Sequence, residues 1–131
     1  MSIRGAILEA VARHDLPTAA QLYRQLKQID PTQALPKPAQ LDVANQLAGE
    51  QLYPQAAEAY ETLLRTYPKA EQIEQIELML GLVYARYLGQ FDKARHYLER
   101  AVLRLHDPTA LAMAREELAH IAASAPPPPP P

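Results

Sequence analysis

The four histidines are the side chains of this sequence best suited to acid–base chemistry or metal binding near neutral pH. They are His14, His96, His106 and His120. Each falls on a different predicted helix or helix end, and no two have the spacing of metal ligands on one helical face. His14 and His106 fall near predicted helix C-termini, where a positive charge is favourable. We therefore expect surface or helix-terminal histidines and no metal site.

Three glutamates, Glu71, Glu74 and Glu77, recur at three-residue intervals in a predicted helix. Paired carboxylates can act as general acid and base when they share an apolar cleft with a reacting group. No second catalytic group accompanies these three, so the run is interpreted as a solvated acidic stripe. The pair Glu116 and Glu117 is interpreted in the same way.

Nucleophilic and cofactor chemistry find little support in the composition. The chain has no cysteine, which excludes disulfides, thiolate metal sites and cysteine nucleophiles. Ser2 and Ser124 are the only serines, and neither lies in the glycine-flanked turn that activates a nucleophilic serine. Four glycines argue against a phosphate-binding loop. The sequence predicts a protein that is not an enzyme and has no catalytic residue, cofactor or metal.

Length and charge restrict the partners. The chain has 131 residues, enough for one compact domain, and a net charge of -2, which argues against nucleic-acid binding. Arg95, Arg100 and Arg104 alternate with Glu99 and are expected on the outer face of a helix. The longest apolar stretch, 78–85, is far shorter than the roughly 20 residues that span a bilayer. We expect a cytoplasmic protein without membrane insertion; an origin in an envelope-associated or membrane protein is the alternative.

Proline positions divide the chain into predicted helices. Proline breaks a helix interior but fits its first turn, and the segments between the seven prolines outside the C-terminal tail are rich in helix-forming residues. Ser2 and Asp107 are expected to cap helix N-termini, and Gly89 a C-terminus. The predicted helices are 2–14, 17–29, 38–50, 54–66, 70–88, 91–106 and 109–123.

Three of these helices share a pattern. Each has a large apolar residue, then alanine three positions later, then two further core residues at offsets that place them on one helical face. The alanines, Ala19, Ala56 and Ala94, are 37 and 38 residues apart. A fixed period of this length is typical of a helical solenoid. A small residue allows two helices to approach closely, and Gly81 is expected to do the same from the facing helix.

This pattern resembles the tetratricopeptide repeat family. The matched residues are Leu80, Gly81, Tyr84, Phe91, Ala94, Leu98 and Ala101 in the third unit, Val43, Ala44, Leu47, Tyr53, Ala56, Tyr60 and Pro68 in the second, and Leu16, Ala19, Tyr23 and Pro31 in the first. The period is longer than the family's 34 residues. Gln40 and Glu77 stand where the family prefers a large aromatic residue. HEAT-type repeats, whose period is longer, are the rival interpretation.

The resemblance implies an all-α fold, a right-handed solenoid of helical hairpins with about seven helices. The predicted domain covers 1–123, with units at about 2–34, 37–69 and 70–108 and a capping helix at 109–123. A proline-rich tail or linker follows at 124–131. Polyproline of this kind forms an extended helix that some aromatic grooves bind.

The resemblance also implies a concave groove, lined by the first helix of each hairpin, that binds a partner. Most of its expected residues are apolar, which favours an amphipathic helix or peptide over the charged clamp that holds a terminal carboxylate in chaperone-binding members. The groove positions carry over to Arg4, Leu8, Val11, Leu41, Asn45, Ala48, Leu78, Leu82 and Arg86.

The predicted function is therefore a protein-interaction module with a protein or peptide partner. The alternative is a structural element that self-associates as a homo-oligomer or docks within a longer scaffold. A further alternative concerns the groove itself, which the chain's own helices could fill.

Overall fold

The computed structural model describes residues 2–124, which form α-helices joined by short connections and one π-helical turn. No strand occurs within this range, so the all-α prediction with seven helices is confirmed. The elements are α1 (Ile3–Ala12), α2 (Leu16–Ile29), α3 (Lys37–Gly49), α4 (Tyr53–Thr66), α5 (Ile73–Val83), η1 (Tyr84–Leu88), α6 (Phe91–Arg104) and α7 (Pro108–Ser124). The predicted tail at 124–131 lies, after Ser124, outside the described residues.

The helices begin where the sequence places their caps. The Ser2 hydroxyl accepts a hydrogen bond from the Gly5 amide at 3.0 Å, and Asp107 Oδ2 accepts one from the Ala110 amide at 2.9 Å. Helices α2, α3 and α4 carry a proline in their first turn, where the missing N–H has no intrahelical partner to lose. These local signals explain why the predicted helix boundaries agree with the structure to within a few residues.

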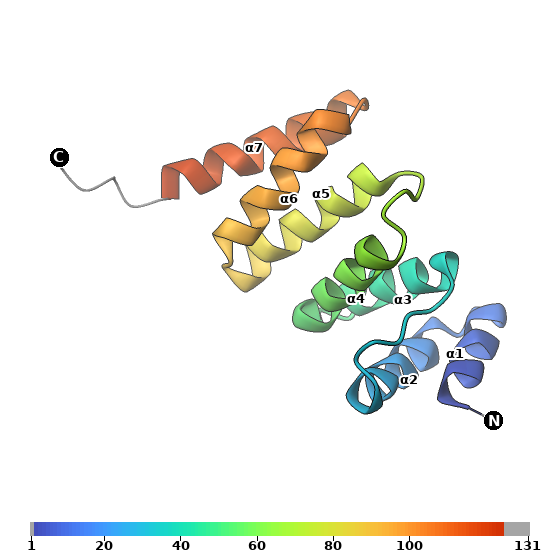
Figure 1. The fold of residues 1–131 in the computed structure, drawn as a ribbon. Coiled ribbons are helices and arrows are strands. Elements are labelled where there is room, and N and C mark those ends of the chain that lie inside the picture. Colours follow the sequence, from blue (N-terminus) through green and yellow to red (C-terminus); the bar gives the residue numbers. More distant parts are fainter. Residues whose placement is uncertain (1, 125–131) are drawn as a thin grey trace. The chain divides into compact units, whose positions relative to one another are not determined.

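The chain divides into two compact units, Met1–Ala70 with α1 to α4 and Glu71–Pro131 with α5 to α7. In unit 1, α1 packs against α2 and α3 against α4, while α2 also contacts α3 (Figure 1). In unit 2, α5 packs against α6, and α7 contacts both. This pairing of successive helices is consistent with the helical-hairpin array expected from the sequence.

Small residues lie where the paired helices meet. Ala19, Ala56 and Ala94 are fully buried, and the core residues that follow them in the repeat pattern are at most 8% exposed. A Cβ atom added to Gly81 of α5 would lie 2.6 Å from Leu98 Cγ of α6. The prediction that Gly81 permits a close approach of two helices is therefore confirmed.

The turns inside the three hairpins repeat with the sequence. Each contains one residue in the left-handed region, at His14, Gln51 and Gly89, with φ of 60°, 63° and 63°. These residues are 37 and 38 apart, the same intervals that separate the three alanines. After His14 and Gln51, the next amide donates to the carbonyl five residues back, with Asp15 N to Ala10 O at 2.8 Å and Leu52 N to Leu47 O at 3.0 Å.

The second interval between the hairpin turns, 38 residues, is one longer than the first, and the π-helical turn η1 contains the extra residue. In the third hairpin the closing bond reaches six residues back, from Gln90 N to Tyr84 O at 3.0 Å. Gln51 lies seven positions after Ala44, whereas Gly89 lies eight positions after Gly81. A π-turn holds one more residue than an α-turn. The third hairpin therefore reaches its left-handed residue at Gly89 although one more residue precedes that position in the repeat pattern.

Candidate partner-binding site

Six of the nine predicted groove residues lie in unit 1, on α1 and α3, which contact each other. Leu8 and Val11 of α1 and Leu41 and Ala48 of α3 are partly exposed, while Arg4 is partly exposed and Asn45 is exposed. We call these six residues the α1–α3 face. Both helices have further apolar residues that fill the core, namely Ile7, Ala10, Val43, Ala44 and Leu47. The apolar part of each helix is thus wider than its buried side requires.

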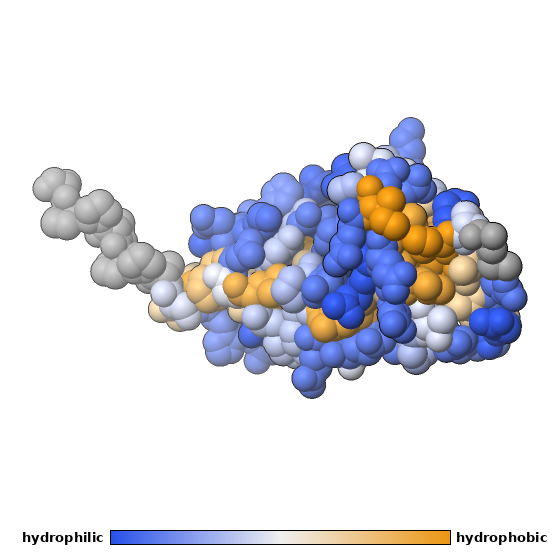
Figure 2. Space-filling view, turned by 90° about the horizontal axis from the view of Figure 1, so that it is seen from below, coloured by the Kyte–Doolittle hydropathy of each residue, from blue (hydrophilic) through white to orange (hydrophobic). Residues whose placement is uncertain are grey.

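Apolar surface is visible in Figure 2, where hydrophobic side chains are exposed among hydrophilic ones. Contiguous apolar surface of this kind often marks an interaction site, whereas single exposed apolar residues do not.

The two polar residues of the α1–α3 face have partners inside unit 1. Arg4 Nε donates to the Ala34 carbonyl at 3.5 Å, and Asn45 Oδ1 accepts from the Tyr60 hydroxyl at 2.6 Å. Burial raises the pKa of Tyr60 to about 12, so its hydroxyl remains a donor at neutral pH. No residue among 2–124 accepts from the Asn45 side-chain amide, which therefore stays free to donate to a partner.

The three predicted groove residues of unit 2 differ in exposure. Leu78 and Leu82 are only 6% and 8% exposed, so in this structure they belong to the core. Arg86 is exposed, and its Nε donates to Glu117 Oε1 of α7 at 3.0 Å. Of the three, only Arg86 is accessible to a ligand.

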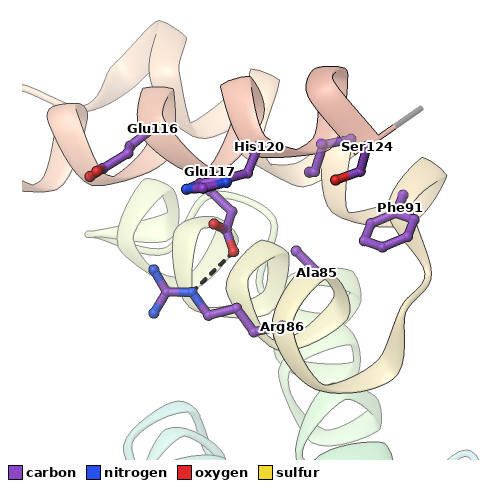
Figure 3. A pocket seen from close by; sticks show the side chains of 8 residues that line it. Ala85, Arg86, Phe91, Glu116, Glu117, His120 and Ser124 are labelled. Atoms are coloured by element: carbon purple, nitrogen blue, oxygen red, sulfur yellow. Dashed lines mark hydrogen bonds and ion pairs between the residues drawn. The ribbon is translucent and has the colours of Figure 1, made fainter. Parts of the chain in front are cut away.

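Beside Arg86 lies an open pocket of about 420 Å³, formed by η1, the start of α6 and α7 (Figure 3). We call it the η1–α7 pocket. Sequence reasoning missed it, because its residues come from three elements and share no spacing. It is lined by Ala85, Arg86, Phe91, Glu116, Glu117, His120, Ile121 and Ser124.

Two glutamates interpreted as solvated are buried, so that prediction is wrong for them. Glu77 is 2% exposed and Glu117 8% exposed, whereas Glu71 and Glu116 are exposed. Each buried carboxylate is compensated by an arginine far away in sequence.

Arg100 is exposed on α6, as expected, and it donates from Nε to Glu77 Oε2 at 2.6 Å. Glu77 Oε1 has no hydrogen-bond partner among residues 2–124. A signal for the burial of Glu77 existed: it occupies the same repeat position as Gln40, 37 residues earlier, which is also buried.

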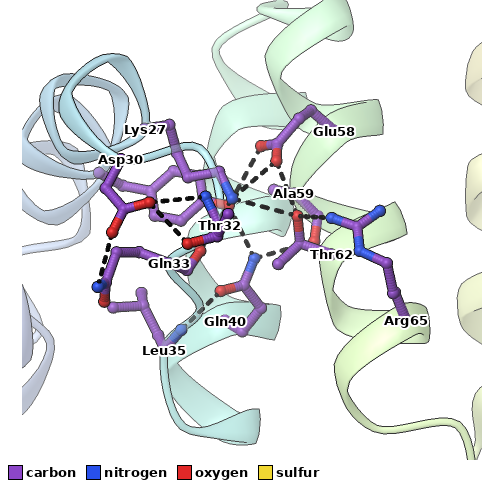
Figure 4. Close-up of polar contacts among 11 residues, drawn as sticks. Lys27, Asp30, Thr32, Gln33, Leu35, Gln40, Glu58, Ala59, Thr62 and Arg65 are labelled. Atoms are coloured by element: carbon purple, nitrogen blue, oxygen red, sulfur yellow. Dashed lines mark hydrogen bonds and ion pairs between the residues drawn. The ribbon is translucent and has the colours of Figure 1, made fainter.

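A network of polar side chains joins α2, α3 and α4 (Figure 4). Gln40 Nε2 donates to the Tyr23 hydroxyl and to the Ala59 carbonyl, both at 3.0 Å, and its Oε1 accepts from the Leu35 amide at 3.0 Å. The Tyr23 hydroxyl donates to Glu58 Oε2 at 3.2 Å, and burial raises the pKa of Tyr23 far above its usual value. Because buried polar groups cost stability unless they are paired, this satisfied network fixes how the three helices pack.

A second open cleft of about 340 Å³ lies in unit 1 between α2 and α4, and several side chains of this network line it. Two cations, Arg24 and Lys27, line this cleft. Lys27 has three partners: the Gln33 carbonyl at 2.8 Å, Glu58 Oε1 at 3.0 Å and Thr62 Oγ1 at 3.4 Å. An ammonium group has three donors, so none remains for a ligand. The ammonium group of Lys27 therefore stabilises the fold.

Two further observations concern metals and membranes. Among residues 2–124, no three His, Asp or Glu side chains gather in a way that could hold a metal ion. Over the same part of the chain, no helix combines the length and the apolar character needed to cross a membrane.

Sequence comparison matches the chain to no known protein family and to no curated protein. The resemblance to tetratricopeptide repeats therefore depends on the repeat residues themselves and stays a prediction.

Proposed function

We propose that this chain is a non-enzymatic protein-interaction module of the tetratricopeptide type, and that its α1–α3 face binds the apolar side of a partner peptide or amphipathic helix. The observation that supports this proposal is the pair of adjacent helices whose apolar residues exceed what the core of unit 1 buries.

The spacing of the apolar residues suits a helical partner. Leu8 and Val11 are three residues apart, and Leu41 and Ala48 are seven apart, so each pair lies along one side of its helix. A helix that binds in a groove presents apolar anchors at the same intervals. Arg4 and the free amide of Asn45 would then set the direction of the bound segment.

A library of displayed amphipathic peptides, selected against the full chain, tests the proposal because it samples many partner sequences at once. We expect selected peptides to bind the unaltered chain and to bind at least tenfold more weakly to the variants Leu8→Asp and Leu41→Asp. A charge introduced into an apolar contact loses the hydrophobic contribution and leaves an unpaired ion.

The matched control is Ile29→Asp, because Ile29 is 70% exposed on α2 and lies outside the α1–α3 face. Circular dichroism establishes that each variant is folded. If no peptide is selected, or if Ile29→Asp weakens binding as much as Leu8→Asp, the proposal is wrong.

Self-association is the second candidate. The observation in its favour is Leu103, which is 85% exposed on α6. A homo-oligomer that used this residue would dissociate in the variant Leu103→Asp. Sedimentation velocity over a hundredfold range of concentration measures this, and a chain that is monomeric throughout excludes the candidate.

A further inference from the structure

Glu117 offers an unused acceptor at the η1–α7 pocket. Its side chain is nine-tenths buried, and its Oε1 accepts from Arg86 Nε at 3.0 Å. No other residue among 2–124 donates to this carboxylate, so Oε2 keeps its capacity to accept a hydrogen bond. A carboxylate withdrawn from water gains stability from each donor it acquires.

The rest of the pocket is partly apolar. Phe91, at the start of α6, is 43% exposed, and Ile121 of α7 lies beneath the surface at 3% exposure. Figure 3 shows Phe91 on one side of the space, with Ala85, and the Arg86–Glu117 pair beside it. An occupant would therefore place an apolar portion against Phe91 and a polar portion near Glu117.

The charges of the lining decide which polar group fits. Arg86 contributes one positive charge, and Glu116 and Glu117 contribute two negative charges. The charge of Arg86 is already neutralised by Glu117, so the remaining charge of the pocket is negative. An anion would be repelled, whereas a cation would be attracted.

We propose that the η1–α7 pocket binds a basic side chain, lysine or arginine, of a partner peptide. Both side chains have an aliphatic stem that packs on apolar surface and a charged end that donates hydrogen bonds. The stem would lie against Phe91 and Ala85, and the charged end would donate to Glu117 Oε2. This site goes beyond the α1–α3 face, with which it shares no residue.

The cleft between α2 and α4 provides the contrast. There Lys27 uses its three donors on Gln33, Glu58 and Thr62, so no donor of this ammonium group remains for a ligand. At the η1–α7 pocket an acceptor remains. The π-turn η1 supplies Ala85 and Arg86 to the pocket, and π-turns occur often at functional sites.

The experiment uses the full chain, labelled with nitrogen-15, and three peptides of the form acetyl-Ala-Ala-X-Ala-Ala-amide in which X is lysine, norleucine or glutamate. Amide shifts of residues 85–91 and 116–124 are followed during titration. We expect the lysine peptide to bind at least tenfold more tightly than the norleucine peptide, since a hydrogen bond to a charged group has about that effect. The glutamate peptide should not bind.

The variant Glu117→Gln keeps an oxygen for Arg86 and removes the negative charge, so we expect it to weaken the lysine peptide about tenfold. Glu99→Gln is the control, since Glu99 is exposed on α6, does not line the pocket and changes the net charge equally. Binding of lysine no tighter than norleucine, stronger binding of glutamate, equal effects of the two variants, or no shifts at all would each overturn the proposal.

Discussion

Gly81 shows how one residue sets the distance between two helices. A Cβ atom there would lie 2.6 and 2.7 Å from two atoms of the buried Leu98 side chain. Overpacking of this kind costs about 1–3 kcal/mol, against a gain of about 1 kcal/mol in helix propensity when alanine replaces glycine. We expect Gly81→Ala to lower the free energy of unfolding by about 1 kcal/mol, as measured by urea denaturation.

The control for this substitution is Gly49→Ala, because nothing lies within 4 Å of a Cβ atom at Gly49. This variant should be as stable as the unaltered chain or up to about 1 kcal/mol more stable. Equal stability of the two variants would contradict the close approach at Gly81.

Tyr60 gives unit 1 a dependence on alkaline pH. Burial raises its pKa from the usual value of 10 to about 12, so the native state retains the proton longer than the unfolded state. The stability that results is fully present below pH 10 and falls as the pH rises from 10 toward 12. We expect Tyr60→Phe to reduce this alkaline loss in urea denaturation at pH 8 and pH 11. An alkaline loss in Tyr60→Phe as large as in the unaltered chain would contradict this role of Tyr60.

Among individual residues, the sequence predicts small and apolar core residues well and paired charges poorly. Ala19, Ala56 and Ala94 are recognisable because each recurs with its neighbours at a fixed interval. Glu117 has no such counterpart, and the arginines that pair with Glu77 and Glu117 are 23 and 31 residues away on other elements. A carboxylate followed by apolar residues looks the same in sequence whether it is solvated or ion-paired.

Among the elements, the helix boundaries are predictable because their causes are local. Proline in a first turn and a capping side chain act within four residues. The π-turn is different: the sequence predicts one helix over 70–88, whereas the structure divides it into α5 and η1. The extra residue is visible in the sequence only as an interval of 38 in place of 37, which a longer loop would explain equally well.

The π-turn predicts a tolerance to deletion at one place in the chain. Removing Ala85 should convert η1 into an α-turn and restore the shorter interval, so the hairpin of α5 and α6 keeps its closing bond. We expect this variant to unfold cooperatively at nearly the same temperature, measured by circular dichroism.

Removing Ala48 from α3 is the matched deletion, since α3 has no extra residue to lose. It should rotate the end of the helix by one position, move Leu47 and the turn out of register and lower the melting temperature strongly. Similar losses in both deletions would show that η1 does not contain an insertion.

For the molecule as a whole, the division into two compact units follows the repeat pattern. The boundary between Ala70 and Glu71 falls where the sequence separates its second and third repeat units. The connection there contains the exposed Lys69. Exposed connections between compact units are the preferred sites of proteolysis.

Limited digestion with trypsin should therefore cut first after Lys69 and release fragments 1–69 and 70–131, identified by mass spectrometry. The variant Lys69→Gln should remove this early cut and leave the slower ones. A first cut inside α2, α4 or α6, all of which contain arginine, would contradict the division.

The hairpin turns offer two positions at which a substitution can raise the thermal stability of the chain. His14 and Gln51 are exposed and hold a backbone conformation that glycine adopts without strain, as Gly89 does in the third turn. Glycine at both positions would relieve that strain and keep every closing bond. More stable versions of this chain can thus be built at two solvent-facing sites outside the core.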